Sequence, residues 1–329
     1  MRKKITLKDI AKLAGVSEST VSLVLNKKDI RISTEKKEEI LRIADELGYR
    51  PNLLAKSLSA QKTFTIGLII PDLSNPFFAS LANHIEIILR SQGYLLFVAN
   101  SNDELEMDKK LIARFQDYQV DALIYCPANE SFSLNKKECA ALTKFSVASV
   151  IVDRIFPDLD KNQVCFDNEY GGYIASKYLL DSGCQNVAFV SGDLNNYNAS
   201  QRFAGYKKAL HEYNQDLNKN IIFPGNYRFE SGYNVDINIL REENVDGVFC
   251  SNDLMAFGLL RKLEESNFAD NVRVVGYDSL FAKEIVPGYF KSVAQDTKLL
   301  AEQVCEQLLG QINDPNYKTT TILSPKLIQ

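Results

Sequence analysis

Polar and aromatic side chains follow the apolar runs of this 329-residue chain, at the positions where strands would end. Asp153 stands beside Arg154, and Phe77 and Phe78 follow Asn75 closely. Carboxylates, amides and guanidinium groups satisfy the hydroxyls of a sugar ring, and aromatic faces stack on its apolar side. We therefore predict a small-ligand site that contains Asn75, Phe77, Phe78, Asp153, Arg154, Phe166, Asn198, Arg202, Tyr227, Asn252, Asp278 and Gln295.

Each of these residues also has an ordinary structural interpretation. Asp or Asn after a strand is often a helix cap, an arginine in the first helical turn is often solvated, and aromatic residues are usually core. For any single residue the cap or core interpretation is the stronger one. Only their recurrence at successive strand ends, where ligands of open α/β sheets bind, favours a shared site.

Catalysis is the main alternative use of such a site. Asp153 and Asp278 could form an acid and base pair. The two histidines, His84 and His211, lie within helical patterns without partners, and no HExxH, GxSxG, GxGxxG or GxxxxGK motif is present. We expect no enzyme, no catalytic residue, no metal site and no cofactor.

The elements that must position these side chains are strands alternating with helices. From Phe64 onward, near-continuous apolar runs are separated by helical segments, a pattern typical of parallel sheets covered on both faces. The predicted fold class is α/β, with two parallel doubly wound sheets. The runs are FTIGLII, YLLFVAN, DALIYC, ASVIVD, NQVCFD, NVAFVS, NIIFPG, DGVFC, VRVVGYD and SVAQD.

The first fifty residues carry a different pattern, that of three short helices. Thr6 and Asp9 have capping-box spacing before the first helix, and Gly15 ends it. Ser17 and Ser33 are the predicted caps of the second and third helices. Two short helices joined by a glycine turn and supported by a third predict a helix-turn-helix, although a generic three-helix bundle has the same periodicity.

The charge of the chain is divided unevenly. Residues 1–62 carry 14 Lys and Arg against 8 Asp and Glu, a net charge of +6, and the remaining residues carry 24 against 34, a net charge of −10. A basic head on an acidic body predicts that only the head approaches a polyanion such as DNA. The polar outer face of the second helix, which includes Glu18, Ser19, Thr20, Ser22 and Asn26, fits docking into a groove.

The segments TLKDIAKLAGVSESTVSLVLN and GYRPNLLAKSLS resemble the DNA-binding head and hinge of the lactose/galactose repressor (LacI/GalR) family. The resemblance implies base contacts from Glu18, Ser19 and Leu23; Glu18 could equally be a favourable first-turn helix residue. Leu23 stands where many members have arginine and offers only apolar contact, for example to a thymine methyl. The full predicted DNA-binding set is Thr6, Ser17, Glu18, Ser19, Thr20, Ser22, Leu23, Asn26, Ser33, Asn52, Ala55 and Leu58.

Residues 51–62 are expected to hold a hinge helix, Asn52 to Ser59, and a linker, and the resemblance implies that the helix forms on the operator. Leu58 would wedge into the minor groove, although it could instead pack on the body of the protein. A helix of about eight residues is marginal alone in water, so it is expected to fold only when supported.

The body resembles the effector domain of the same family and the periplasmic sugar-binding proteins, through PDLSNPFF, VIVDR, ASQRFAGY, SNDLMAFG, VVGYDSL and VAQDT. This implies a DNA-binding domain at 1–50 and an effector domain at 63–329. The expected crossings between its lobes lie near Gln163, Lys291 and Ile322. They place residues 63–162 and 292–321 in the N-lobe, and 163–291 and 322–329 in the C-lobe.

The resulting hypothesis is a sequence-specific regulator, a repressor of a carbohydrate-utilisation operon, controlled by a small sugar such as a ribose-like monosaccharide. The expected partners are double-stranded operator DNA, the sugar effector and a second copy of the chain in a homodimer. An inducer would separate the hinge helices, and a co-repressor would bring them together. A protein corepressor, a non-sugar effector and a sugar-binding protein without a DNA role are the alternatives.

Composition is consistent with this hypothesis. No stretch of eighteen apolar residues exists to span a bilayer, so no membrane partner is expected. The N-terminus has no apolar core of a signal peptide, which predicts a cytoplasmic protein. The six cysteines lie apart without a CxxC pair, which favours buried, reduced thiols.

Overall fold

The computed structural model describes residues 5–26, 29–49, 62–279 and 290–328. The chain divides into two compact units, Met1–Thr63 and Phe64–Gln329. The hinge-helix prediction, including Asn52, Ala55 and Leu58, lies outside the described residues.

The first unit contains three helices, α1 (Leu7–Ala14), α2 (Glu18–Leu25) and α3 (Thr34–Glu46). Its start signals act as predicted. The backbone N–H and hydroxyl of Thr6 both donate to the Asp9 carboxylate, at 2.9 and 2.7 Å, and the Ser17 hydroxyl accepts from the backbone of Thr20 at 3.2 Å. Gly15 ends α1 at φ +64°, a conformation that glycine adopts without steric cost, so the turn into α2 stays tight.

A small apolar core fixes the three helices of this unit. Ile10 of α1, Val21 of α2 and Ile40 of α3 are fully buried together. Because these residues take the inner faces, the polar residues of α2 are left on its outer face.

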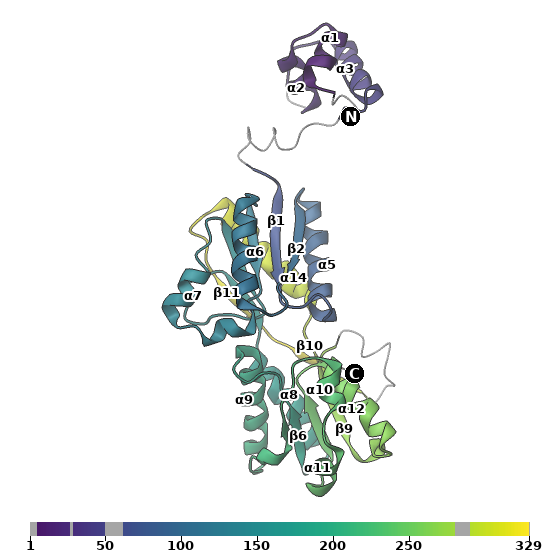
Figure 1. The fold of residues 1–329 in the computed structure, drawn as a ribbon, viewed down its shortest axis with the longest axis vertical. Helices are drawn as coiled ribbons and strands as arrows, with labels where there is room; N and C mark the ends of the chain where they lie inside the picture. The colour runs from purple at the N-terminus through teal and green to yellow at the C-terminus, as the bar shows by residue number, and fades with distance from the viewer. Residues whose placement is uncertain (1–4, 27–28, 50–61, 280–289, 329) are drawn as a thin grey trace. The chain divides into compact units, whose positions relative to one another are not determined.

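The second unit is built around two six-stranded sheets (Figure 1). The strand order of the first sheet is β11-β5-β4-β3-β1-β2, and all its pairings are parallel. Its strands are β1 (Thr65–Ile70), β2 (Leu95–Asn100), β3 (Ala122–Tyr125), β4 (Ala148–Val152), β5 (Gln163–Phe166) and β11 (Thr320–Leu323).

The strand order of the second sheet is β12-β10-β9-β8-β6-β7. Five strands are parallel and β12 alone pairs antiparallel, with β10. The strands are β6 (Val187–Val190), β7 (Ile222–Phe223), β8 (Gly247–Cys250), β9 (Arg273–Asp278), β10 (Lys291–Ala294) and β12 (Lys326–Ile328). All ten apolar runs of the sequence are strands, which confirms the predicted α/β class.

Helices cover both faces of each sheet. In the first lobe they are α5 (Pro76–Ser91), α6 (Leu105–Asp117), α7 (Lys136–Leu142), α14 (Thr297–Asn313) and the 3₁₀ turn η1 (Asn129–Ser133). In the second they are α8 (Asn168–Asp181), α9 (Tyr197–Glu212), α10 (Phe229–Tyr233), α11 (Ile237–Glu242), α12 (Asp253–Glu265), and the 3₁₀ turns η2 (Lys219–Ile221) and η3 (Ala269–Asn271). Each face has its own buried apolar cluster. All six cysteines are buried free thiols, as predicted.

The predicted lobe boundaries are wrong by a few residues. Gln163 begins β5, and that whole strand pairs within the first sheet, so the chain crosses only after Phe166. The second crossing follows β10, and the third lies between β11 and β12. The physical reason is that a strand completes its hydrogen-bonded ladder before the chain leaves the sheet, so each crossing falls in the loop that follows the strand.

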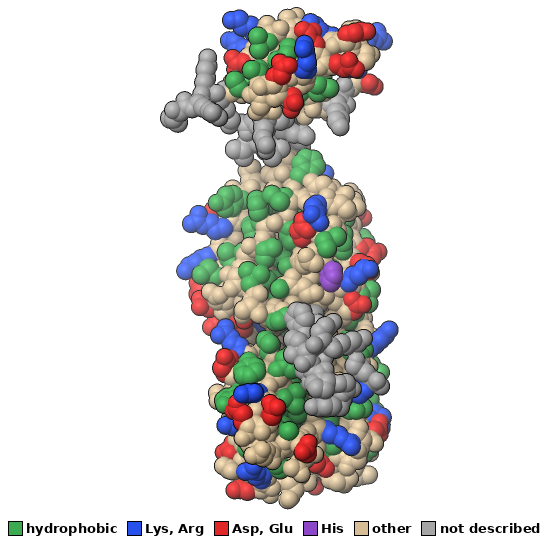
Figure 2. Space-filling view, turned by 90° about the vertical axis from the view of Figure 1, so that its right-hand side faces the viewer, with side chains coloured by type: hydrophobic (Ala, Val, Ile, Leu, Met, Phe, Trp, Pro, Cys, Tyr) green, Lys and Arg blue, Asp and Glu red, His purple; other side chains and the backbone are tan. Residues whose placement is uncertain are grey.

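The edge strand β2 also differs from expectation, because its apolar run is not covered on both faces. Leu95, Phe97 and Val98 are 56, 40 and 41% exposed. Figure 2 faces the side of the molecule that carries α5 and β2, and it shows hydrophobic side chains gathered on this lobe.

Helices α8 and α9 pack so closely that glycine is required between them. A Cβ atom on Gly172 would lie 2.1 Å from the carbonyl oxygen of Arg202, and one on Gly205 would lie 2.0 Å from that of Glu169. This contact fixes the backbone of Arg202 against α8.

Gly172→Ala is therefore expected to lower the free energy of unfolding by about 1–3 kcal/mol, because backbone atoms must separate to admit the methyl group. Urea denaturation of the purified protein measures this. The matched control is Gly310→Ala in α14, where the added Cβ meets only the Tyr317 side chain at 3.2 Å. Equal stability of the two variants would contradict the argument.

Candidate functional site

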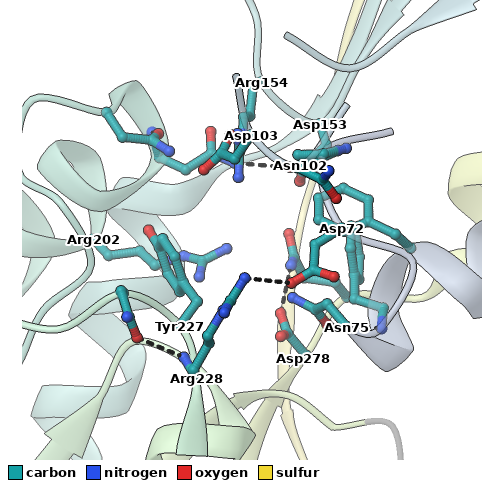
Figure 3. A pocket seen from close by; sticks show the side chains of 17 residues that line it. Asp72, Asn75, Asn102, Asp103, Asp153, Arg154, Arg202, Tyr227, Arg228 and Asp278 are labelled. Carbon is teal, nitrogen blue, oxygen red and sulfur yellow. Dashed lines mark hydrogen bonds and ion pairs between the residues drawn. The ribbon is translucent and has the colours of Figure 1, made fainter. Parts of the chain in front are cut away.

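A cleft between the two lobes of the second unit lies at the carboxyl ends of both sheets, as the fold predicts (Figure 3). Its cavity volume is about 80 Å³. The lining is mostly polar and charged, with the rings of Phe77, Phe78 and Tyr227 among it. The residues that line the cleft are Pro71, Asp72, Asn75, Phe77, Phe78, Asn102, Asp103, Asp153, Arg154, Asn196, Asn198, Arg202, Asn226, Tyr227, Arg228, Asp278 and Gln295.

All but two of the predicted ligand-binding residues line this cleft. Phe166 does not, because its side chain is buried in the apolar cluster of the first lobe. Asn252 does not either: it caps α12 by accepting from the backbone of Met255 at 3.0 Å, and it donates to the carbonyl oxygen of Tyr227 at 2.8 Å. Asn252 therefore holds the backbone of Tyr227, which lines the cleft, and does not itself line it.

Arg202 is held rigidly at the second-lobe side of the cleft. Its Nε donates to Asn168 at 2.8 Å, its Nη1 donates to the carbonyl oxygen of Ser251 at 2.6 Å, and its guanidinium lies 3.7 Å from the ring centroid of Tyr277. The side chain is 4% exposed. A buried guanidinium with fixed partners presents its remaining N–H groups to the cleft without rotamer freedom.

Asp278 lies near this arginine at the end of β9. Gln295 donates to one of its carboxylate oxygens at 2.9 Å. Burial, with a smaller contribution from the neighbouring Asp153 carboxylate, raises the pKa of Asp278 to about 7, while Arg202 and Gln295 oppose the shift.

Asp153 and Arg154 follow β4 on the first-lobe side. Asn198, at the start of α9, donates to Asp153 at 3.2 Å across the cleft. Burial raises the pKa of Asp153, and the adjacent Arg154 and Arg202 oppose that effect. The Arg154 guanidinium lies 5.9 Å from the ring centroid of Phe78 and 2.5 Å from a carboxylate oxygen of Asp103.

Three buried polar atoms of the lining lack hydrogen-bond partners: Asn198 Oδ1, Tyr227 OH and Gln295 Oε1. Leaving a buried polar atom unsatisfied costs about 1–3 kcal/mol, so a cleft with three of them is suited to a ligand that supplies hydroxyl groups. The backbone at the site is also strained. Asp153, Tyr227 and Asp278 have φ of +66°, +65° and +99°, in the left-handed region that L-residues rarely adopt.

Sequence reasoning missed several lining residues. Asn102 and Asp103 come directly after β2, so the strand-end rule could have found them. Arg228 pairs with Asp72 at 3.7 Å, a contact from one lobe to the other that no spacing indicates. Asn196 and Asn226 stand two residues before Asn198 and Arg228, and their side chains cap the backbone at those positions, at 2.7 and 3.2 Å.

The first unit places the predicted DNA-binding residues of α2 on one polar face. Ser17, Glu18, Ser19 and Asn26 are exposed, and Leu23 is half-buried. The hydroxyls of Ser17 and Ser19 lie 2.7 Å apart, and Thr20 joins them, its hydroxyl lying 2.9 Å from that of Ser17. Thr6 and Ser33 cap α1 and α3, while Thr20 and Ser22 are half-buried on α2.

A helix-turn-helix unit followed by a two-lobed domain with a polar cleft defines a DNA-binding regulator of the small-molecule-responsive class. Residues 6–52 match the family model of bacterial regulatory proteins, lacI family, and residues 63–327 match that of periplasmic binding proteins and the sugar binding domain of the LacI family. The chain therefore belongs to the LacI family and is a DNA-binding transcription regulator.

A curated relative, the HTH-type transcriptional repressor PurR of Histophilus somni strain 2336, is 32% identical over 98% of this chain and 97% of its own length. The fold also matches a crystal structure of the Lac repressor dimer bound to operator and the anti-inducer ONPF, with a TM-score of 0.88, 24% identity, and coverage of 99 and 98%. A periplasmic binding protein/LacI regulator from Alkaliphilus metalliredigens QYMF, complexed with D-xylulofuranose, matches at TM-score 0.69 and 26% identity over 80% of this chain and 97% of its own.

The described residues contain no group of three His, Cys, Asp or Glu side chains placed to hold a metal ion. None of the helices formed by those residues has the length and apolarity needed to cross a lipid bilayer.

Replacing Asp278 by Asn is expected to stabilise the ligand-free protein at pH 8 by up to about 4 kcal/mol and to have little effect near pH 4. The native carboxyl holds its proton to about pH 7, whereas the unfolded chain releases it near the ordinary value of 3.8. Asp278 therefore lowers the free energy of unfolding progressively as pH rises from about 4 to 7, and Asn cannot ionise.

Urea titrations at pH 4 and pH 8 measure the difference. Asp158→Asn, which changes an exposed carboxylate of the same unit, is the control and is expected to follow the wild type. A gain in stability that is the same at both pH values would show that ionisation of Asp278 has no part in it.

Proposed function

We propose that this chain is a repressor of a carbohydrate-utilisation operon and that its effector is a small neutral sugar. Among sugars, a ribose-like monosaccharide is the favoured candidate. The single observation that carries the proposal is the set of three unpartnered polar atoms in a cleft that also holds two buried carboxylates and two buried arginines. Sugar hydroxyls both donate and accept, so they satisfy amide oxygens, carboxylates and guanidinium groups together.

The charges of the cleft favour a neutral ligand. The lining contains four carboxylates, Asp72, Asp103, Asp153 and Asp278, and three guanidinium groups, those of Arg154, Arg202 and Arg228. Asp103 and Asp72 are already paired with Arg154 and Arg228, and the raised pKa of Asp278 leaves it partly protonated near neutral pH. The remaining charges, those of Asp153 and Arg202, are opposite in sign, so the lining has no positive excess that would favour a phosphate and little negative excess that would favour an ammonium group.

The relatives support two effector classes. The Alkaliphilus protein carries a sugar, D-xylulofuranose, in its crystal structure. Because the curated relatives are named PurR, a purine-type effector is the second candidate. The unpartnered amide oxygens of Asn198 and Gln295 accept hydroxyl donors from several directions, which favours the sugar.

The head supplies operator recognition in this proposal. Exposed hydroxyl and amide groups of α2 contact phosphates and base edges, and Leu23 reads a thymine methyl in place of a hydrogen-bonded base contact. The protein works in the cytoplasm, where its operator DNA is.

A homodimer fits both the head and the body. One helix-turn-helix reads a half-site, and a pair reads a palindrome. The exposed apolar side chains of the edge strand β2, Leu95, Phe97 and Val98, form a surface that a second copy would cover. The effector then acts by shifting the angle between the lobes, and it can do so only through different affinities for the two arrangements.

Tyr227→Phe is expected to weaken effector binding about threefold to tenfold, because it removes one hydrogen bond to a ligand hydroxyl. The same change should leave the ligand-free protein at least as stable, since the removed hydroxyl is unsatisfied there. Calorimetric titration with pentoses, hexoses, disaccharides, their phosphates and purine bases measures the affinity.

Arg202→Ala is expected to abolish binding, and Lys208→Ala, an exposed change on the same helix, should leave it unchanged. Binding of a purine base alone would replace the sugar by the second candidate. If none of the compounds bound while the protein still bound DNA, the sugar assignment would be wrong.

Leu23→Ala is expected to cost about 1–3 kcal/mol of affinity for the preferred operator and to remove the preference at one base pair, since an apolar base contact is lost. Selection of sites from a random duplex library, followed by anisotropy titrations, measures both. Ser22→Ala is the matched control: the family resemblance implies that the Ser22 hydroxyl contacts a phosphate, so its loss should weaken binding to selected and unrelated DNA alike. An unchanged selected sequence with Leu23→Ala would refute the base contact.

A further inference from the structure

Two hydrogen bonds beside the cleft join the first lobe to the second. In one, Asn198 donates to Asp153 at 3.2 Å. In the other, the side-chain amide of Asn196, which caps α9, donates to Asn129 Oδ1 at the start of η1. Asn196 is 1% exposed, and the stacked rings of Phe132 and Tyr197 lie beside it, with centroids 6.5 Å apart.

The second bond continues into the first lobe. The backbone N–H and the side-chain amide of Asn129 donate to the two carboxylate oxygens of Asp103, at 2.9 and 2.5 Å. Arg154 Nη1 also donates to Asp103, at 2.5 Å, and to the carbonyl oxygen of Pro127 at 3.0 Å. One carboxylate therefore orients both Asn129, which reaches the other lobe, and Arg154, which lines the cleft.

The third polar contact between the lobes is of a different kind. Arg228 and Asp72 form an ion pair at 3.7 Å, and the Arg228 side chain is 65% exposed. Exposed pairs of this type contribute little, because water and salt screen them. Asn196 itself is buried, so loss of its bond leaves an unsatisfied buried amide and has the larger effect on closure.

We propose that Asp103, Asn129 and Asn196 form a clasp that holds the lobes together beside the cleft and, through Asp103, couples closure to the position of Arg154. The proposal rests on the proposed function only in taking the cleft as the effector site. Asp103 and Asn129 act as positioning residues. A ligand that moves the Arg154 guanidinium changes the geometry at Asp103 and so shifts the lobe equilibrium that exists without ligand.

The test measures the lobes without any effector. Cysteines introduced by Lys110→Cys in α6 and Lys207→Cys in α9 accept spin labels, since both lysines are exposed and the six native thiols are buried. Pulsed electron paramagnetic resonance on the full-length protein then gives the interlobe distance distribution. Asn129→Ala is expected to lower the ratio of closed to open molecules about threefold to tenfold, the factor for one lost hydrogen bond that leaves the buried Asn196 amide unsatisfied.

A reciprocal exchange supplies the rescue. Asp103→Asn alone sets two amide donors against each other, and Asn129→Asp alone sets two carboxylates face to face. The double variant restores the hydrogen bonds between positions 103 and 129 and leaves an amide oxygen at position 103 to accept from Arg154, so the distribution should shift back toward that of the wild type. A residue with a merely local structural role would not show this recovery.

The matched control is Asn135→Ala, which removes the cap of α7 in the same lobe and crosses no cleft. It should lower the melting temperature without changing the interlobe distance. An unchanged distribution with Asn129→Ala, an equal shift with Asn135→Ala, or no recovery in the double variant would each overturn the clasp. Because no effector is added in this experiment, a result that contradicts the clasp says nothing about the sugar effector, and a negative sugar titration says nothing about the clasp.

Discussion

The arrangement of the two lobes depends on one constraint, which is that charged side chains are buried in the cleft between them. Asp153, Arg154, Arg202 and Asp278 are all less than 9% exposed, and buried ions are tolerated only when they are paired and hydrogen-bonded. The carbonyl oxygens of Pro127 and Ser251, together with Asn168, Asn198 and Gln295, supply those partners. Closing the lobes with these groups satisfied, while some amide and hydroxyl atoms stay unsatisfied, makes the cleft receptive to a polar ligand.

The sheets explain how so many polar groups reach one place. In both lobes the parallel strands end at the cleft, so each loop that follows a strand adds a side chain there. The rigid contact of α8 with α9, which admits only glycine, holds Arg202 in position. Positive backbone φ at Asp153, Tyr227 and Asp278 shows that the site is held in a strained arrangement by the surrounding packing.

The proposed function requires that the state of this cleft be transmitted to the DNA-binding head. The body can do so because its lobes are joined by three crossings and a few polar bonds, and not by a continuous apolar core. Two such bonds share the Asp153–Arg154 corner of the cleft, directly or through Asp103. Occupancy and lobe angle are therefore properties of the same set of side chains.

The sequence by itself determined the helix caps at Thr6, Ser17 and Ser33, ten of the twelve described strands and most of the cleft lining, because these follow from local hydrogen bonding, apolar periodicity and the rule that strand ends meet. It did not determine that Phe166 faces the core, that Asn252 stands behind Tyr227, or where each crossing falls, since these depend on side-chain direction and ladder length. The Asp103–Asn129–Asn196 bonds and the Arg228–Asp72 pair join residues far apart in the chain, so only the tertiary structure decided them.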